Sequence, residues 1–178
     1  MRIAPKKFYR FIPRPIVLIT SIDKLGRINA APMSFVTPLE MEPPILAFST
    51  SYESDTYRNI VETKEFVVAL VTEEIKKQMW ICGKSFPRGT NELEKAGLHW
   101  RPSEKVKPPQ VVECPINLEC VLEWIHEGPE YVVIAGRVLA CHAKRGATSR
   151  RGLNARDVRP LLHLWGKFFV IGDHPSEL

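Results

Sequence analysis

Two polar stretches in the first third of the chain combine residue types that suit a planar, phosphorylated ligand. The first is GRINAAPMSF, residues 26–35, which lies between two apolar runs. Asn29 can offer a hydrogen-bond donor and an acceptor to the edge of a heteroaromatic ring, and Ala30 and Ala31 would let the backbone approach that ring closely. The stretch ends with a hydroxyl group and an aromatic face, on Ser34 and Phe35. The same residues are also compatible with an edge strand that Pro32 interrupts with a bulge.

The second stretch follows a strand-like run and carries many hydroxyl groups ahead of a helix-like segment. These hydroxyl side chains are on Ser49, Thr50, Ser51, Ser54 and Thr56. Arg58 adds a cation shortly afterwards. Hydroxyl groups, the free N–H groups of a helix N-terminus and a cation together form a suitable cradle for a phosphate. Ordinary N-capping of a surface helix is the competing interpretation.

Motifs for other kinds of catalysis are absent from the sequence. GxSxG, GxGxxG and GxxxxGK[ST] do not occur, so a serine-hydrolase elbow, a Rossmann dinucleotide site and a P-loop lack their main support. The four cysteines form no CxxC pair, and the five histidines form no HxH or HxxxH pair. We therefore expect reduced buried thiols, no metal site, and histidines, His163 among them, with surface or packing roles. No catalytic side chain is expected, and the hard chemistry of an enzyme would belong to a bound cofactor.

Length and composition point to an ordinary globular protein. The 178 residues fit one domain, which we expect to span residues 1–178. No run approaches the roughly 18 apolar residues of a membrane helix. The charged N-terminus is not followed by the apolar segment of a secretory signal, so we expect a cytoplasmic protein. Two glutamines and five asparagines against fifteen prolines are weakly compatible with a thermophilic source.

The net charge of +5 permits a polyanionic partner but does not single one out. The basic residues are scattered, with the densest group at 144–159, and aromatic residues are not interleaved with that group. This pattern makes a nucleic-acid partner unlikely. A single phosphate-bearing ligand would be served equally well by the modest excess of positive charge.

Strand-like segments dominate the chain. Period-2 alternation and β-branched residues predict strands at 16–20, 45–49, 65–71, 116–124, 131–141 and 167–171. Helices are predicted at 57–63, after N-cap residues at 54–56, at 73–80 and at 90–97, where Gly97 would end the last one. Gly136, inside the long late strand, predicts a bulge or a tight barrel corner. Many strands with few short helices favour a closed antiparallel β-barrel with helical excursions.

The two polar stretches, in this order, resemble the flavin reductase-like family of FMN-binding split barrels, which includes flavoredoxin-type proteins. The resemblance rests on RPIVLITSIDKLGRINAAPMSF, EPPILAFSTSYESDTYRNI, FPRGTNELEKAGL, ECPINLEC and YVVIAGRV, and it covers roughly residues 10–171. It implies a mainly β fold, namely a single antiparallel split β-barrel of Greek-key type with about six strands and a few short helices. It also implies a homodimer with FMN at the subunit interface.

The resemblance further implies which residues would serve FMN. Those lining the isoalloxazine ring would be Asn29, Ala30, Ala31, Ser34 and Phe35. Those holding the ribityl chain and the phosphate would be Ser49, Thr50, Ser51 and Thr56, with Arg58 as a nearby cation. Near the C-terminus, Trp165 or Phe169 would close the pocket.

Two positions depart from the family pattern. Relatives often carry a lysine or a serine–lysine pair where this chain has residues 88–92. They often carry a histidine at the start of the long late strand, where this chain has Tyr131. Tyr131 could still stack on the cofactor or form a hydrogen bond with it, but we expect no proton relay there.

The implied function is an FMN-dependent NAD(P)H oxidoreductase of the flavin reductase type, which moves hydride or electrons through bound FMN. The alternative is a flavoredoxin-like FMN electron carrier that serves a redox partner protein and has no direct NAD(P)H activity. A basic β-barrel that binds nucleic acid is the interpretation from a different class.

Overall fold

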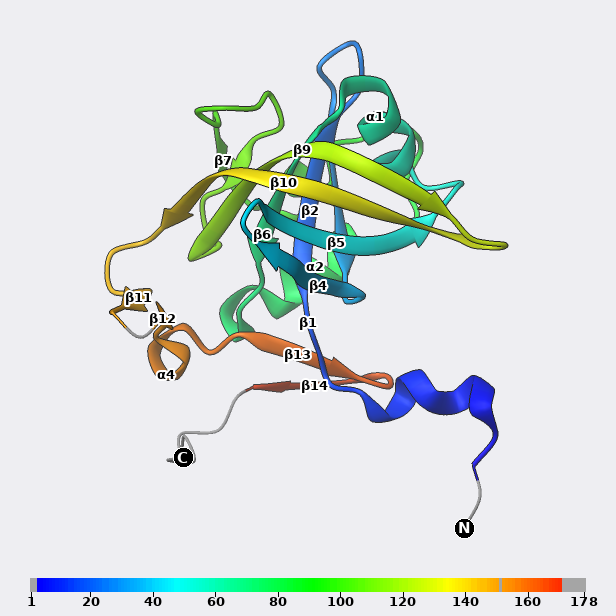
Figure 1. Ribbon diagram of the computed structural model, residues 1–178. Helices are drawn as coiled ribbons and strands as arrows, with labels where there is room; N and C mark the ends of the chain where they lie inside the picture. Colours follow the sequence, from blue (N-terminus) through cyan, green and yellow to red (C-terminus); the bar gives the residue numbers. More distant parts are fainter. Residues whose placement is uncertain (1–2, 151, 171–178) are drawn as a thin grey trace.

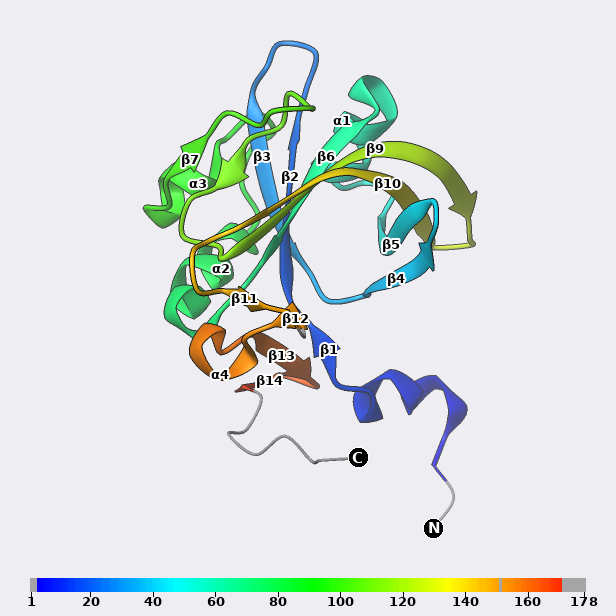
Figure 2. The ribbon, with the colours of Figure 1, turned by 60° about the vertical axis from the view of Figure 1, so that its left-hand side comes forward.

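The centre of the protein is a strongly curled antiparallel sheet. The computed structural model describes residues 3–150 and 152–170, and its main sheet has seven strands in the order β3-β2-β6-β9-β10-β5-β4. Their bounds are β2 Val17–Ile22, β3 Ile28–Met33, β4 Val36–Met41, β5 Pro44–Ser51, β6 Glu65–Leu70, β9 Ile116–Glu127 and β10 Tyr131–Ala143. Figures 1 and 2 show this sheet wrapped into a barrel. The predicted mainly β, antiparallel barrel with few short helices is therefore confirmed, with seven strands in the main sheet instead of about six.

The polar stretch at 26–35 contains a strand that forms one edge of the sheet. β3 pairs antiparallel with β2, with Asn29 opposite Ser21. The Ala30 N–H points away from β2, because it donates to the side chain of Glu92 at 2.8 Å. Backbone N–H groups two residues apart in a strand point to the same side. Pro32 therefore lacks its N–H on the free edge, where a strand tolerates proline.

The predicted irregularity at Gly136 is confirmed. The register between β10 and β9 shifts between Ala135 and Gly136. A Cβ atom on Gly136 would overlap the ring of Phe66, one of the largest fully buried side chains. Glycine is required here because the barrel core approaches the strand too closely for a side chain.

The three predicted helices are also present. The first is α1, Asp55–Thr63, which begins at Ser54, whose Oγ accepts a hydrogen bond from the Tyr57 N–H at 3.1 Å. The second begins as the 3-10 turn η2, Glu73–Ile75, and continues as α2, Lys76–Cys82. The third is α3, Glu92–Ala96, which ends at Gly97 with a φ of +69°.

A smaller layer lies beside the barrel (Figure 1). It contains the 3-10 helix η1, Pro5–Phe11, and a three-stranded sheet of β1, Arg14–Pro15, β13, Leu161–Leu164, and β14, Lys167–Val170. The strand predicted at 167–171 thus forms, but it pairs with β13 outside the barrel, and residue 171 lies outside the described residues. The short remaining elements are β7 Trp100–Arg101, β8 Gln110–Val111, β11 Thr148–Ser149, β12 Gly152–Leu153 and α4 Ala155–Val158. Over the described ranges, the search for a helix long and apolar enough to cross a membrane finds none.

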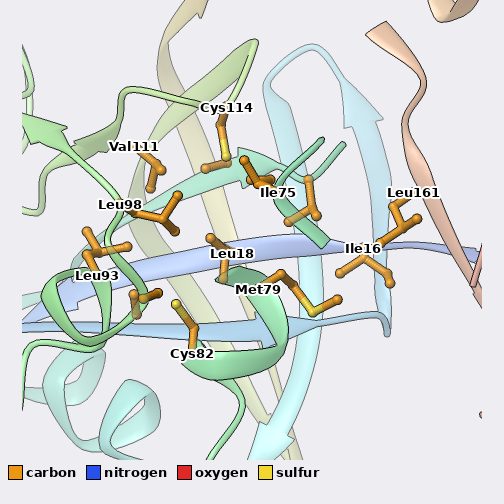
Figure 3. Close-up of a cluster of buried hydrophobic side chains, with 14 residues drawn as sticks. Ile16, Leu18, Ile75, Met79, Cys82, Leu93, Leu98, Val111, Cys114 and Leu161 are labelled. Carbon is orange, nitrogen blue, oxygen red and sulfur yellow. The ribbon is translucent and has the colours of Figure 1, made fainter. Parts of the chain in front are cut away.

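Two apolar clusters fix these elements relative to one another. One fills the barrel, where the rings of Phe48 and Phe66 meet edge to face with centroids 5.5 Å apart. The other lies between the outside of the sheet and the short helices, and Figure 3 shows Leu18, Met79 and Leu93 pointing into it. Burial of such side chains stabilises each by about 1.5–3 kcal/mol. The second cluster therefore holds α2 and α3 on the sheet, and with them the connecting residues 83–91 beside β3.

Candidate functional site

A polar cavity of about 450 Å³ lies where β3, the N-terminus of α1 and the segment after α2 meet. Its β3 wall contains Asn29, Ala30, Ala31 and Pro32. Its other walls contain Glu53, Ser54, Asp55, Thr56, Arg58, Cys82, Gly83, Lys84, Ser85, Phe86, Arg88 and Glu92. The fold thus brings five of the predicted site residues to one cavity, namely Asn29, Ala30, Ala31, Thr56 and Arg58.

Asn29 has a structural task inside this polar cavity. It is 8% exposed, and its Nδ2 donates to the Thr56 Oγ1 at 3.0 Å and to the Ser21 Oγ at 3.2 Å. Asn59 of α1 donates to the same Ser21 oxygen at 3.2 Å. The Asn29 amide nitrogen therefore joins α1 to the sheet, which leaves its Oδ1 and the surrounding backbone as the groups that could meet a ligand.

The positive charge of the polar cavity comes from Arg58, Lys84 and Arg88. The Arg88 Nη1 lies 2.9 Å from the Asp55 Oδ1, and the Arg58 Nη1 lies 3.6 Å from the same oxygen. Within the described part of the chain, Lys84 makes no ion pair. Because the first N–H groups of a helix also lack partners inside the helix, Lys84 and the start of α1 are the groups of this cavity that could meet an anion.

Two contacts hold the segment after α2 close to β3. A Cβ atom on Gly83 would lie 3.1 Å from the Pro32 Cγ, so a larger residue would fit only if the proline ring shifted by a few tenths of an ångström. The Glu92 Oε2 accepts the Ala30 N–H at 2.8 Å. Glu92 is buried, and this burial raises the pKa of its carboxyl group, with the Ala30 hydrogen bond acting in the opposite direction. The relative position of β3 and the segment after α2 therefore depends on contacts between residues that are far apart in the sequence.

A second, apolar cavity of about 370 Å³ lies at the far end of the same stretch. Its walls contain Arg14, Ser34, Phe35, Val36, Thr37, Leu39, Ala47, Phe48, Ser49, Trp124 and Val133. A connecting cavity of about 310 Å³ shares Pro32, Gly83 and Lys84 with the polar cavity and Ser34 with the apolar one. The three cavities therefore share wall residues along 29–35, from a polar end with three basic and three acidic side chains to an apolar end.

One wall of the connecting cavity contains His163, for which we expected only a surface or packing role. The His163 Nδ1 lies 3.2 Å from the Ser34 Oγ and 3.2 Å from the Arg14 Nη2. Burial and the charge of Arg14 lower the pKa of His163. A neutral imidazole therefore stands beside Ser34 at neutral pH.

The other predicted residues occupy different positions. Thr50 is buried, and its hydroxyl bonds the Ser54 Oγ at 3.0 Å in the turn before α1, while the Ser51 Oγ accepts the Glu53 N–H at 3.2 Å. Tyr131 is exposed and, with Phe35, Ser49 and the η1 residues Phe8 and Tyr9, borders a surface hollow. The Trp165 ring lies under the Arg10 guanidinium, with the Cζ atom 3.6 Å from the ring centroid. Phe169, opposite Leu162 in the small sheet, is half-exposed.

Lys84 and Ser85 are the main residues that the sequence analysis did not select. A possible signal was the small–basic–hydroxyl order of residues 83–85 directly after a predicted helix. That signal alone is weak, since it becomes informative only when the fold places the segment opposite β3.

Comparison with known proteins agrees with this fold and extends over most of the chain. A model of the flavin reductase like domain matches residues 8–172. An uncharacterized protein of Aquifex aeolicus is 37% identical over 165 residues, which is 89% of this chain and 84% of that protein. Nitrilotriacetate monooxygenase component B from Bacillus cereus aligns with a TM-score of 0.91 and 28% identity over 99% of this chain and 98% of that one. The 2-nitrobenzoate 2-nitroreductase NbaA of Pseudomonas fluorescens aligns with a TM-score of 0.88 and 28% identity over 100% of this chain and 95% of that one.

Proposed function

This chain belongs to the flavin reductase-like family, and from that premise we propose that it is an FMN-dependent oxidoreductase that takes electrons from NAD(P)H. The family and the two relatives named as a monooxygenase component and a nitroreductase support a flavin-linked redox function. The choice of FMN and of a nicotinamide donor is our proposal.

The observation that carries the proposal is the row of adjoining cavities along residues 29–35. Its polar end offers Lys84, the hydroxyl groups of Thr56 and Ser85, and the N-terminus of α1. These groups match a phosphate in charge and hydrogen bonding. The connecting cavity beside it is mostly apolar, as a flat heteroaromatic ring requires. A mononucleotide flavin has this same order of groups, with one phosphate at one end and a ring system at the other.

The residues of this chain would hold the flavin and exclude water, since the flavin itself supplies the two-electron chemistry. Lys84 and Arg88 would bind the phosphate, the latter by releasing part of its contact with Asp55. The backbone at Ala30 and Ala31 would lie close to the ring, because neither residue has a side chain that keeps it away. Pro32 and Gly83 would keep the two walls close together.

We also propose that the protein is a homodimer whose interface covers the face around Phe35. Three large apolar side chains are exposed there around one surface hollow: Phe8, Phe35 and Tyr131. An exposed apolar patch of this kind on a single chain usually marks an interface. Light scattering at micromolar concentration should give twice the mass of the chain, and a monomer that retains flavin would contradict an interfacial site.

The names of the same relatives support two different kinds of electron acceptor. The Bacillus cereus protein is named as one component of a monooxygenase, which favours a partner protein that uses the reduced flavin. The Pseudomonas fluorescens protein is named as a nitroreductase, which favours direct reduction of a small molecule. An electron carrier that receives electrons from another protein is the remaining alternative.

Absorbance spectra of the purified protein test the proposal. We expect FMN to bind and its absorbance to bleach when NADH or NADPH is added without oxygen. Bound FMN that bleaches only with a chemical reductant would favour the electron carrier. A protein that binds no FMN would contradict both.

A further inference from the structure

Arg14 is a buried cation whose neighbours do not neutralise it. The side chain is 7% exposed, and its Nε is buried without a hydrogen-bond partner. The Nη1 donates to the backbone oxygen of Tyr9 at 2.9 Å, and the Nη2 lies 3.2 Å from the His163 Nδ1. No carboxylate forms an ion pair with Arg14 within residues 3–150 and 152–170.

A guanidinium in this setting is unusual because arginine stays charged at every ordinary pH. Burial of an unpaired charge is costly, and buried charges are normally paired with an opposite charge. The groups that face Arg14 from neighbouring elements are the Tyr9 carbonyl, the His163 imidazole and the Phe35 ring, whose centroid lies 4.6 Å from the Arg14 Cζ. All three are uncharged at neutral pH, since burial and Arg14 itself lower the pKa of His163.

The lining of the apolar cavity next to Arg14 indicates the chemistry of a ligand that could supply the missing negative charge. Apart from Arg14, its polar side chains are the hydroxyl groups of Ser34, Thr37 and Ser49. The aromatic faces are those of Phe35 and Trp124, and its volume of about 370 Å³ is within the range of small-molecule pockets. One charged group against an otherwise apolar wall suits a ligand that is itself apolar and carries one anionic group.

We propose that the apolar cavity binds a small aromatic monocarboxylate, whose carboxylate pairs with Arg14 and whose ring lies against Phe35 and Trp124. Ser34 also borders the connecting cavity, so this ligand would be a neighbour of the proposed flavin. That adjacency to a flavin rests on the proposed function, whereas the binding of the carboxylate does not.

The first test uses the purified wild-type protein and three small probes. Benzoate combines the ring and the charge, benzamide keeps the ring without the charge, and acetate keeps the charge without the ring. We expect calorimetry to give benzoate at least a roughly tenfold lower Kd than benzamide, and acetate to bind more weakly than either. Equal affinities for benzoate and benzamide, or no binding of benzoate, would overturn the proposal.

The second test uses Arg14→Gln, with Arg137→Gln as the matched control. Arg137 lies in β10, is half-exposed and is paired with Glu123 at 3.1 Å. Arg14→Gln should reduce benzoate affinity to the benzamide level, whereas Arg137→Gln should leave it unchanged. Benzoate affinity that survives Arg14→Gln would contradict the assignment. If that variant does not fold, the three probes on the wild type still decide the matter.

An FMN titration of the same samples separates this inference from the proposed function. Selective benzoate binding without FMN binding would overturn the flavin proposal alone. FMN binding without selectivity for benzoate would overturn this inference alone. If Arg14→Gln weakens FMN binding and leaves benzoate binding unchanged, the guanidinium serves the flavin and our assignment is wrong.

Discussion

The polar cavity and the apolar cavity lie at opposite ends of residues 29–35. Their buried polar groups differ in whether the chain itself supplies partners for them. At the polar end, the buried Asn29 Nδ2 and the Ala30 N–H are hydrogen-bonded within the chain, to Ser21, Thr56 and Glu92. At the apolar end, the buried Arg14 has a free Nε and no carboxylate beside it within the described ranges. The first set of contacts satisfies the buried polar groups of the polar end, whereas the second leaves the charge of Arg14 without a counter-ion.

Because of this difference, we expect substitutions at the polar end to lower stability, and substitution of Arg14 at the apolar end to affect ligand binding more than stability. A satisfied buried group costs stability when it is removed, because its partners lose their hydrogen bonds. An unpaired buried charge already lowers stability, so its removal has little cost or a gain. Residues retained at a cost to stability are frequently those that bind or react.

The largest expected change in stability follows from Asn29→Ala. Loss of the amide leaves the Ser21 and Thr56 hydroxyl groups with fewer partners in a buried place, which should lower the free energy of unfolding by about 1–3 kcal/mol. Urea unfolding measures this, with Thr37→Ala as the control, because the Thr37 hydroxyl is exposed and donates to the oxygen of the neighbouring Pro38. Equal losses for the two variants would remove the structural task that we assign to Asn29.

Arg14→Met should have a smaller effect of the opposite sign. Methionine fills a similar apolar volume without the charge, so the free energy of unfolding should stay unchanged or rise by about 1 kcal/mol. The same urea experiment gives the result. A loss as large as that of Asn29→Ala would mean that the hydrogen bonds to Tyr9 and His163 outweigh the cost of the buried charge, and the contrast between the cavities would fail.

Glu92→Gln should have the smallest effect on the free energy of unfolding, and this effect should appear only as a dependence on pH. Its pKa is raised in the folded state, so the folded protein binds the proton more tightly than the unfolded chain. The stability that Glu92 contributes should therefore be present at low pH and be lost as pH rises through the folded pKa. The wild type should lose stability relative to Glu92→Gln over this range, and parallel pH curves for the two proteins would contradict the raised pKa.

Much of the fold could be predicted because its signals are local. Alternation marked the long strands, Ser54 and Gly97 marked helix ends, and Gly136 marked the irregularity in β10. The strand predicted at 167–171 forms over the described residues 167–170, and its pairing with β13 outside the barrel could not be predicted, since periodicity does not say which neighbour a strand pairs with.

The site could be predicted only in part, for a related reason. Asn29 and Thr56 were identified from their own chemistry, and the fold does bring them together. Lys84 and Arg14 acquire meaning only from contacts across long separations, such as that between Arg14 and His163. Thr50 was selected as a hydroxyl group, but its neighbours in the turn already use it.

The central claim is that the polar cavity is built for the phosphate of a mononucleotide flavin. Equilibrium titration of the purified protein with FMN and with riboflavin, which lacks only the phosphate, tests it most directly. We expect FMN to bind roughly 10- to 100-fold more tightly, and Lys84→Met to remove most of that difference while leaving riboflavin affinity unchanged. Equal affinities for FMN and riboflavin in the wild type would contradict the account.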